Sequence, residues 1–120
     1  MLRVRVPLPV VQADRSYDVL VGRGAIGELR RHLPDGARRV AVVTQPGLVG
    51  PAGVLGWDPA DLLDDIDVTV HEIGVGEAAK SLATVERLLR GFAAQGVTRR
   101  DVVVGVGGGM VTDVAGFAAA

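Results

Sequence analysis

The chain of 120 residues contains no cysteine, which excludes disulfide bonds, thiolate metal sites and cysteine nucleophiles. It has no apolar run approaching the roughly 20 residues that cross a membrane, and arginine alternates with valine over Met1 to Val10, where a leader would be apolar. Neither charge sign dominates, with 13 basic and 14 acidic residues, so the composition does not indicate nucleic-acid binding. We therefore expect a cytoplasmic protein that binds neither nucleic acid nor membrane.

Lysine is nearly absent from the sequence. All but one of the 13 basic residues are arginine, and the exception is Lys80. An ammonium group is a compact point charge, whereas a guanidinium group is a planar fork. A single lysine in an arginine-rich chain therefore favours a role specific to the ammonium group, although an ordinary solvated side chain remains an alternative.

The C-terminal end of the sequence carries the most informative pattern. Val102 to Val106 is rich in β-branched residues and predicts a buried parallel strand. Gly107 to Gly109 follow at once, and Val114 to Ala120 is compatible with a helix. A strand, a glycine turn and a helix form the layout in which backbone N–H groups approach a phosphate at a helix N-terminus.

Two standard phosphate-binding motifs do not fit this stretch. A P-loop needs Lys followed by Ser or Thr, but Met110 and Val111 stand there. The dinucleotide fingerprint G-x-G-x-x-G, started at Gly105, would need glycine at position 110. The alternative interpretation, a glycine turn that binds no ligand, therefore remains open. We expect Thr112 or Asp113 to cap the helix that follows.

A complete G-x-G-x-x-G runs from Gly22 to Gly27, between a predicted strand at Tyr17–Val21 and a short predicted helix at Ala25–Leu33. In a dinucleotide-binding unit of this kind, the next strand ends in Asp or Glu, which binds a ribose. Here the next strand, Arg39–Thr44, is followed by Gln45. We therefore do not assign the cofactor to this motif.

The predicted elements alternate between strand and helix. Strands are expected at Leu2–Val10, Tyr17–Val21, Arg39–Thr44, Asp67–Ile73 and Val102–Val106, and helices at Ala25–Leu33, Pro59–Ile66, Glu77–Ala94 and from Thr112 onward. The first two strands can pair as a hairpin, Asp58 can cap the helix at Pro59, and Gly96 can end the helix from Glu77. Leu48 to Ala60 is rich in Gly and Pro and should be mostly loop. The order predicts an α/β fold, a parallel Rossmann-like sheet with flanking helices and an N-terminal β-hairpin.

Three segments resemble a known family. GEAAKSLATVERLL (Gly76–Leu89) and GGGMVTDVAGFAAA (Gly107–Ala120), preceded by YDVLVGRG (Tyr17–Gly24), closely resemble the N-terminal domain of 3-dehydroquinate synthase. Related sugar phosphate cyclases share this scaffold, as do, more distantly, iron-dependent alcohol and glycerol dehydrogenases, which tend to carry lysine where Phe117 stands. The resemblance implies that residues 1–120 are an incomplete N-terminal NAD-binding domain, truncated before a C-terminal helical domain.

The resemblance also implies an activity. Enzymes of this family reduce and reoxidise a bound NAD within one cycle while converting 3-deoxy-D-arabino-heptulosonate 7-phosphate, a phosphorylated sugar acid, into 3-dehydroquinate and phosphate. This lyase reaction belongs to the shikimate pathway of aromatic amino acid biosynthesis. The divalent metal, zinc or cobalt, is held by one Glu and two His of the C-terminal domain, so neither metal ligands nor catalytic residues are expected within this chain.

Alternatives to this activity remain open. The chain is also compatible with another sugar phosphate cyclase, such as one like 2-epi-5-epi-valiolone synthase, or with a catalytically inert nucleotide-binding fragment. For the full-length form, the resemblance implies a homodimer.

The resemblance places the cofactor contacts on three loops, each of which follows a predicted strand. The residues are Gln45, Val75, Gly76, Glu77, Ala78, Ala79, Lys80, Gly108, Gly109, Met110, Val111, Thr112 and Asp113. By this resemblance, Gly108 and Gly109 present N–H groups to the pyrophosphate, Glu77 accepts hydrogen bonds from ribose hydroxyls, and Asp113 bonds a hydroxyl or holds the glycine turn. Gln45 and Val75 stand where the family often has Asp.

Overall fold

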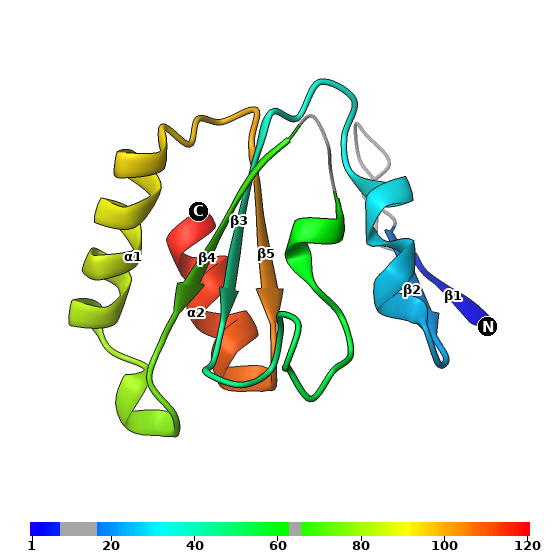
Figure 1. The fold of residues 1–120 in the computed structure, drawn as a ribbon, viewed down its shortest axis with the longest axis horizontal. Helices are drawn as coiled ribbons and strands as arrows, with labels where there is room; N and C mark the ends of the chain where they lie inside the picture. Colours follow the sequence, from blue (N-terminus) through cyan, green and yellow to red (C-terminus); the bar gives the residue numbers. More distant parts are fainter. Residues whose placement is uncertain (8–16, 63–65) are drawn as a thin grey trace. The chain divides into compact units, whose positions relative to one another are not determined.

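The computed structural model describes residues 1–7, 17–62 and 66–120. The chain divides into two compact units, Met1–His32 and Leu33–Ala120 (Figure 1). No helix in these ranges is long and apolar enough to cross a membrane.

The N-terminal unit contains the predicted hairpin strands. β1 (Leu2–Val6) and β2 (Tyr17–Val21) pair antiparallel, and Asp18 of β2 forms an ion pair with Arg5 of β1 at 2.6 Å. Residues 8–16, which include the end of the predicted first strand and the predicted turn, lie outside the described residues. The antiparallel pairing is therefore confirmed for the described part of both strands.

The short helix predicted at Ala25–Leu33 is present as a 3-10 helix, η1 (Ala25–His32). Gly24 precedes it with a φ of 76°, in the left-handed region, and the N–H of Gly27 donates to the carbonyl of Gly24 at 3.0 Å. This hydrogen bond spans three residues, which is the 3-10 spacing rather than the α-helical one.

The second unit is built on a parallel sheet of three strands. β3 spans Arg39–Thr44, β4 spans Asp67–Glu72 and β5 spans Val102–Val106. Their order is β4-β3-β5, with β3 in the centre and all arrows in Figure 1 pointing the same way. Because β3 is covered on both faces, Val40 to Val43 are fully buried, as expected for a central parallel strand. The predicted Rossmann-like α/β fold is confirmed.

Two helices cover one face of this sheet. α1 spans Leu82–Gln95 and α2 spans Gly109–Ala119. The core beneath them consists of Ala41, Val43, Ile73, Leu88, Phe92, Val111, Val114, Ala115 and Ala118. Residues of the other sheet face, among them Thr44 and Val70, line a cavity with the loop after β3 and the start of η2 (Pro59–Leu62). α1 and α2 therefore lie on one face of the sheet, and the Gly/Pro-rich loop lies on the opposite face.

The strand order creates a switch point between β3 and β5. The chain passes from β3 to β4 on one side and then returns through α1 to β5 on the other side of β3. In open parallel sheets, ligands bind outside the carboxyl ends of the strands where the direction of winding reverses. The loops after β3 and β5 lie at this position.

The helix predicted from Glu77 begins later than expected. Glu77–Ala79 forms a separate 3-10 turn, η3, and Ser81 is extended with a φ of −145°. The Ser81 hydroxyl accepts the N–H of Thr84 at 3.2 Å, so it caps α1 and fixes the start at Leu82. The predicted end is confirmed, because Gly96 has a left-handed φ of 85° and its N–H bonds carbonyls of the last turn.

The apolar side chains of α1 are only partly buried. Leu88 and Phe92 lie in the core, but Leu82 is 79% exposed and Leu89 is 47% exposed. Leu82 belongs to the first turn, beyond the area that α2 covers, and it lines a groove described below.

The predicted side-chain cap of the last helix is wrong. α2 begins at Gly109, its N-cap is Gly108, and no side chain caps it. Thr112 lies inside the first turn, where its hydroxyl donates to the carbonyl of Gly109 at 3.0 Å. Asp113, one residue further, forms an ion pair with Lys80 instead. Because the helix starts three residues earlier than predicted, neither side chain can reach the free N–H groups at its start.

The Gly/Pro-rich segment is a loop, as predicted. It is held by main-chain bonds such as Val54 N–H to Gly47 O at 2.9 Å and Leu55 N–H to Leu48 O at 3.1 Å. Asp58 caps the next element as expected, with its carboxylate accepting the N–H of Ala60 at 3.0 Å. That element is the 3-10 helix η2, and the remainder of the predicted helix, residues 63–65, lies outside the described residues.

Asp101 ties together the amino ends of β3 and β5. Its carboxylate accepts hydrogen bonds from the N–H of Thr98 at 2.8 Å, from the Thr98 hydroxyl at 3.2 Å and from the N–H of Arg39 at 3.1 Å. The Thr98 N–H bond is the main reason that the pKa of Asp101 lies below its ordinary value of 3.8. These hydrogen bonds fix the sheet at its amino end, opposite the loops that follow the carboxyl ends of the strands.

Candidate functional site

Hydrogen bonds join the loops that follow β3, β4 and β5 at the carboxyl end of the sheet. The buried Thr44 hydroxyl donates to the carbonyl of Val106 at 2.8 Å, which links the ends of β3 and β5. The N–H of Ile73 donates to the carbonyl of Thr44 at 2.9 Å, and the amide of Gln45 donates to the carbonyl of Gly74 at 3.3 Å. The loops that follow β3, β4 and β5 therefore meet at one edge of the sheet.

Two glycines in this region are required by packing. A Cβ on Gly107 would lie 2.7 Å from Cγ2 of Val111, and its φ is 154°. A Cβ on Gly105 would lie 3.0 Å from Cβ of Ala115. Gly105 therefore lets α2 approach β5 closely, and Gly107 lets the chain turn over the first turn of α2.

The other two glycines of the turn face open space. A Cβ on Gly108 or Gly109 would meet no protein atom within 4 Å. Both are exposed, and the first N–H groups of α2 have no capping side chain. The first four N–H groups of an α-helix lack partners within the helix, and they carry the positive end of the helix dipole. The start of α2 thus offers N–H donors and free room, which suits a phosphate.

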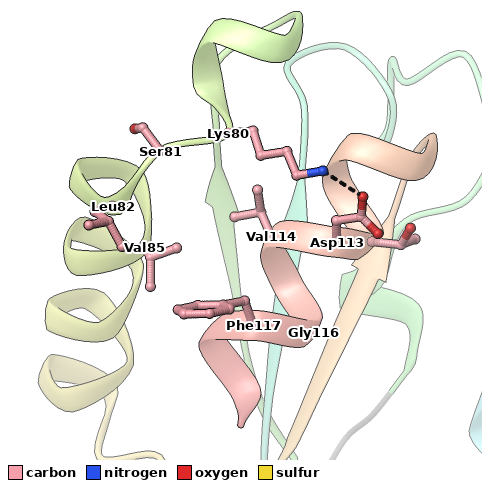
Figure 2. A pocket seen from close by; sticks show the side chains of 9 residues that line it. Lys80, Ser81, Leu82, Val85, Asp113, Val114, Gly116 and Phe117 are labelled. Atoms are coloured by element: carbon pink, nitrogen blue, oxygen red, sulfur yellow. Dashed lines mark hydrogen bonds and ion pairs between the residues drawn. The ribbon is translucent and has the colours of Figure 1, made fainter.

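An ion pair joins the loop after β4 to α2. Nζ of Lys80 lies 3.0 Å from Oδ2 of Asp113, and their side chains are 49% and 59% exposed (Figure 2). Lys80 follows η3, and Asp113 lies in the second turn of α2. The two segments that the resemblance assigns to cofactor binding are therefore brought together, with the only lysine of the sequence at their junction.

A groove of about 620 Å³ opens between α1 and α2 beside this ion pair. Its walls are apolar, with Leu82 and Val85 on α1 and Val114 and Phe117 on α2 (Figure 2). Phe117 is 64% exposed, and its ring points toward α1 (Figure 2). The groove therefore combines an apolar interior with a charged pair at one end.

The predicted residues differ in what they can present to a ligand. The side chain of Val111 is buried, so that this residue can offer only its main chain. Met110 packs against the core, whereas Val75 is 77% exposed and Thr112 is exposed. Gly76 has a left-handed φ of 86° and turns the chain into η3, which comprises Glu77, Ala78 and Ala79.

Sequence reasoning missed three residues that shape the site. Thr44 binds the end of β5, Ser81 ends the loop after β4 by capping α1, and Gly105 allows close helix packing. Ser is a favoured N-cap residue, so Ser81 is a local signal that could have shown the later helix start. Thr44 and Gly105 act through long-range contacts, which no local pattern reveals.

Across the described ranges, no group of three or more His, Cys, Asp and Glu side chains is arranged to hold a metal ion. The residues of this chain therefore do not fit a metal site within those ranges.

The comparison with protein families identifies one match. Residues 70–120 match the family described as 3-dehydroquinate synthase N-terminal. These residues contain the loop after β4, the glycine turn and α2.

Among curated proteins, the chain is similar to several synthases over nearly its whole length. It is 45% identical to a protein named "Putative aminodehydroquinate synthase" from Amycolatopsis mediterranei, covering 98% of this chain and 31% of that protein. It is 42% identical to a 3-dehydroquinate synthase of Nocardia farcinica and 40% identical to one of Mycolicibacterium gilvum, each over 92% of this chain and 30% of the relative. The chain thus spans about a third of the length of these relatives.

Among solved structures, the fold is similar to 2-deoxy-scyllo-inosose synthase in complex with carbaglucose-6-phosphate, NAD⁺ and Co²⁺. The TM-score is 0.77 with 24% sequence identity, over 98% of this chain and 30% of that one. This likeness concerns the fold. Together with the sequence matches, it confirms the resemblance: the chain is similar to the N-terminal third of the 3-dehydroquinate synthases and their relatives.

Proposed function

We propose that this chain is the NAD-binding part of an enzyme of the 3-dehydroquinate synthase type. The complete enzyme would convert 3-deoxy-D-arabino-heptulosonate 7-phosphate into 3-dehydroquinate and phosphate, as a lyase of the shikimate pathway. The observation that carries the proposal is the open glycine turn at the uncapped start of α2. It lies at the switch point of the parallel sheet, within residues 70–120, which match the family described as 3-dehydroquinate synthase N-terminal.

The residues at the turn fit the pyrophosphate of NAD. Gly108 and Gly109 leave free room where a side chain would stand, and the N–H groups at the start of α2 point to the carboxyl edge. Val111 and Met110 would contribute through their main chain, because their side chains pack into the protein. NAD itself would supply the acceptance and return of a hydride during the reaction.

The loop after β4 would hold the sugar portions of the cofactor. Val75, Gly76 and the η3 residues Glu77, Ala78 and Ala79 come to the same edge as the glycine turn, which Lys80 joins through Asp113. The ion pair, in which Nζ of Lys80 lies 3.0 Å from Oδ2 of Asp113, places an ammonium group beside the first two turns of α2. Asp113 and Thr112 present oxygen atoms on the exposed side of α2, suited to ribose hydroxyls.

The proposed reaction also needs a divalent metal, zinc or cobalt. Since the described residues of this chain offer no group of ligands for it, we derive no step through the metal. We propose that its ligands and the acid–base groups belong to the remaining part of a longer enzyme, which would be a cytoplasmic homodimer.

A second function is favoured by one comparison. The identity to the "Putative aminodehydroquinate synthase" is 45%, against 42% and 40% for two 3-dehydroquinate synthases. An enzyme acting on an amino analogue of the substrate would use the same cofactor part. A different sugar phosphate cyclase, or an inert nucleotide-binding protein, would share it too.

One experiment separates these possibilities. The complete protein, supplied with NAD and zinc or cobalt, is incubated with 3-deoxy-D-arabino-heptulosonate 7-phosphate and, separately, with an amino analogue of that substrate, and phosphate release is followed. Faster release from the first substrate supports the 3-dehydroquinate synthase, and faster release from the second supports the amino variant. Binding of NAD without release from either would refute both and leave another cyclase or an inert protein.

A further inference from the structure

Thr44 ends the buried run of β3 with a polar side chain. It is 1% exposed and follows Val40 to Val43, which are apolar and fully buried. A valine at this position would have nearly the same shape and the same preference for a strand. It would also bring no buried hydroxyl group that needs a hydrogen-bond partner. Packing alone therefore does not explain a threonine at the end of the strand.

The hydroxyl group of Thr44 is committed to β5. It donates to the carbonyl of Val106 at 2.8 Å, and the two residues are buried, so the bond is shielded from water. The carbonyl of Thr44 accepts the N–H of Ile73 at 2.9 Å, directly after β4. Thr44 is therefore bonded to the ends of both neighbouring strands, to β4 through its main chain and to β5 through its side chain.

The bond to Val106 acts on the first peptide group of the glycine turn. The carbonyl of Val106 and the N–H of Gly107 belong to one planar peptide group, in which they point in opposite directions. A carbonyl held toward β3 therefore fixes the plane from which the chain continues through Gly107. The φ of Gly107 is 154°, a conformation that side chains disfavour, so this residue needs a restraint from outside.

The other end of the glycine turn is held by α2. The N–H of Thr112 donates to the carbonyl of Gly108 at 3.1 Å, and its hydroxyl donates to the carbonyl of Gly109 at 3.0 Å. Between Val106 and α2 the chain is glycine, the residue with the largest conformational freedom. Ordering a loose glycine segment on binding lowers the affinity for a ligand, whereas a turn that is already fixed avoids this loss.

We propose that Thr44 is a positioning residue, whose hydroxyl group holds the glycine turn in the conformation that binds the anion. The inference rests on the proposed function, and Thr44 acts through the carbonyl of Val106 rather than by contact with the ligand. Without the hydroxyl, the Val106–Gly107 peptide can rotate. The N–H donors that follow then lose their common direction, and a carbonyl oxygen turned toward the site would repel a phosphate.

Two pairs of variants isolate the hydroxyl group. Thr44→Val replaces it by a methyl group of similar size, and Thr44→Ser keeps it while removing the methyl group. If Thr44→Val does not fold, Thr44→Ala is compared with Thr44→Ser instead, because both lack the methyl group and only serine has the oxygen. Circular dichroism establishes that each variant is folded.

Thr69→Val is the matched control. Thr69 is a partly buried threonine of β4, and its hydroxyl also has partners within the protein, Nε2 of His71 at 2.7 Å and the side-chain oxygen of Gln95. Its neighbour on β3 is Ala41, three residues before Thr44, so it lies away from the carboxyl end of the sheet. Its replacement removes the same group from the same sheet without touching the glycine turn.

The experiment measures Kd for NAD and for inorganic pyrophosphate by calorimetry on the complete protein and its variants. Thr44→Val should raise the Kd for NAD by about tenfold, the equivalent of one misaligned hydrogen bond to a charged group. The Kd for pyrophosphate should rise as well, whereas Thr44→Ser and Thr69→Val should bind both nearly as the wild type does. In the ligand-free protein, the amide NMR shifts of Gly107 to Gly109 should change in Thr44→Val and not in Thr69→Val.

The outcomes separate this inference from the proposed function. An unchanged Kd in folded Thr44→Val, or in Thr44→Ala where that variant stands in, would overturn the inference. So would a Thr44→Ser variant that binds no better than the variant without the oxygen, because the methyl group rather than the hydroxyl would then be responsible. An equal loss in Thr69→Val would also overturn it, since the effect would reflect general destabilisation. Failure of the wild type to bind NAD would instead refute the proposed function.

Discussion

A valine at position 109 is the most direct test of the glycine turn. In the structure, a Cβ on Gly109 meets no protein atom within 4 Å, and the residue has an ordinary negative φ as the first residue of α2. A larger side chain should therefore be tolerated by the fold. It would fill the space that the proposed pyrophosphate needs, so Gly109→Val should abolish NAD binding while the protein stays folded.

The expected loss follows from the hydrogen bonds that the side chain would block. A hydrogen bond to a charged group contributes about 1.5–3 kcal/mol, which corresponds to roughly ten- to a hundredfold in Kd for each bond lost. Displacement of the phosphate from the start of α2 removes at least one such bond, and the steric overlap adds to this. Stability should not fall, since glycine is an unfavourable helix residue.

The assay is titration of the complete protein with NAD, with circular dichroism on every variant. Gly27→Ala, in the N-terminal G-x-G-x-x-G, is the matched control, because a Cβ there meets nothing within 4 Å and Gly27 has no positive φ. Gly107→Ala is the opposite control. It should lower the melting temperature, because its Cβ would overlap Val111.

One outcome would refute this reasoning. If Gly27→Ala removes NAD binding in a folded protein and Gly109→Val leaves it intact, the cofactor lies at the N-terminal motif. The assignment to the start of α2 would then be wrong.

Three further predictions concern the Lys80–Asp113 ion pair, the hydrogen bonds of Asp101 and the activity of the isolated chain. Lys80→Ala should weaken NAD binding less than Gly109→Val does, because an exposed ion pair contributes little. We expect the Kd for NAD in a titration to rise by about tenfold or less. A larger rise than that of Gly109→Val would contradict this ranking. Asp101→Asn should lower the melting temperature at neutral pH, because the carboxylate accepts bonds from Thr98 and Arg39. Since its folded pKa lies below 3.8, the stabilisation by Asp101 is complete above that value and is lost as the pH falls through the folded pKa, so wild type and variant should converge in acid melts. The isolated 120-residue chain should release no phosphate from 3-deoxy-D-arabino-heptulosonate 7-phosphate above a no-protein blank, because the metal-dependent chemistry needs ligands that its described residues do not provide.

The three strands of the parallel sheet could be predicted from the sequence almost to the residue. Arg39–Thr44 and Val102–Val106 have the predicted bounds, and Asp67–Glu72 differs from the prediction by one residue. Their signal is local, because valine-rich runs bounded by turn residues suit only a buried strand. Because these signals are local, the alternation of strands and helices could also be predicted. That alternation in turn predicts the parallel sheet.

The helix starts could not be predicted in the same way. Glu77 to Ala79 favours helix by composition, yet it forms a separate turn because Ser81 is extended and caps α1. At α2, Thr112 and Asp113 are good capping residues, but the strand ends so close to Gly108 that the helix has already begun. In both cases the start is set by the geometry of the preceding loop rather than by propensity.

The glycines of the segment VGVGGG show why the candidate site needed a structure. In the sequence all four are equivalent, and the run suggests only close backbone approach. In the fold, the absence of a side chain at Gly105 leaves room for Ala115, and its absence at Gly107 leaves room for Val111. Both glycines are therefore needed for packing whether or not a ligand binds. Gly108 and Gly109 have no protein neighbour that requires them. Glycine is an acceptable N-cap residue, but unlike Ser, Thr, Asp or Asn it brings no side-chain oxygen to accept one of the free N–H groups. The uncapped start with two glycines facing open space therefore leaves both donors and room for a group from outside the protein, and N–H donors at a helix start suit an anion.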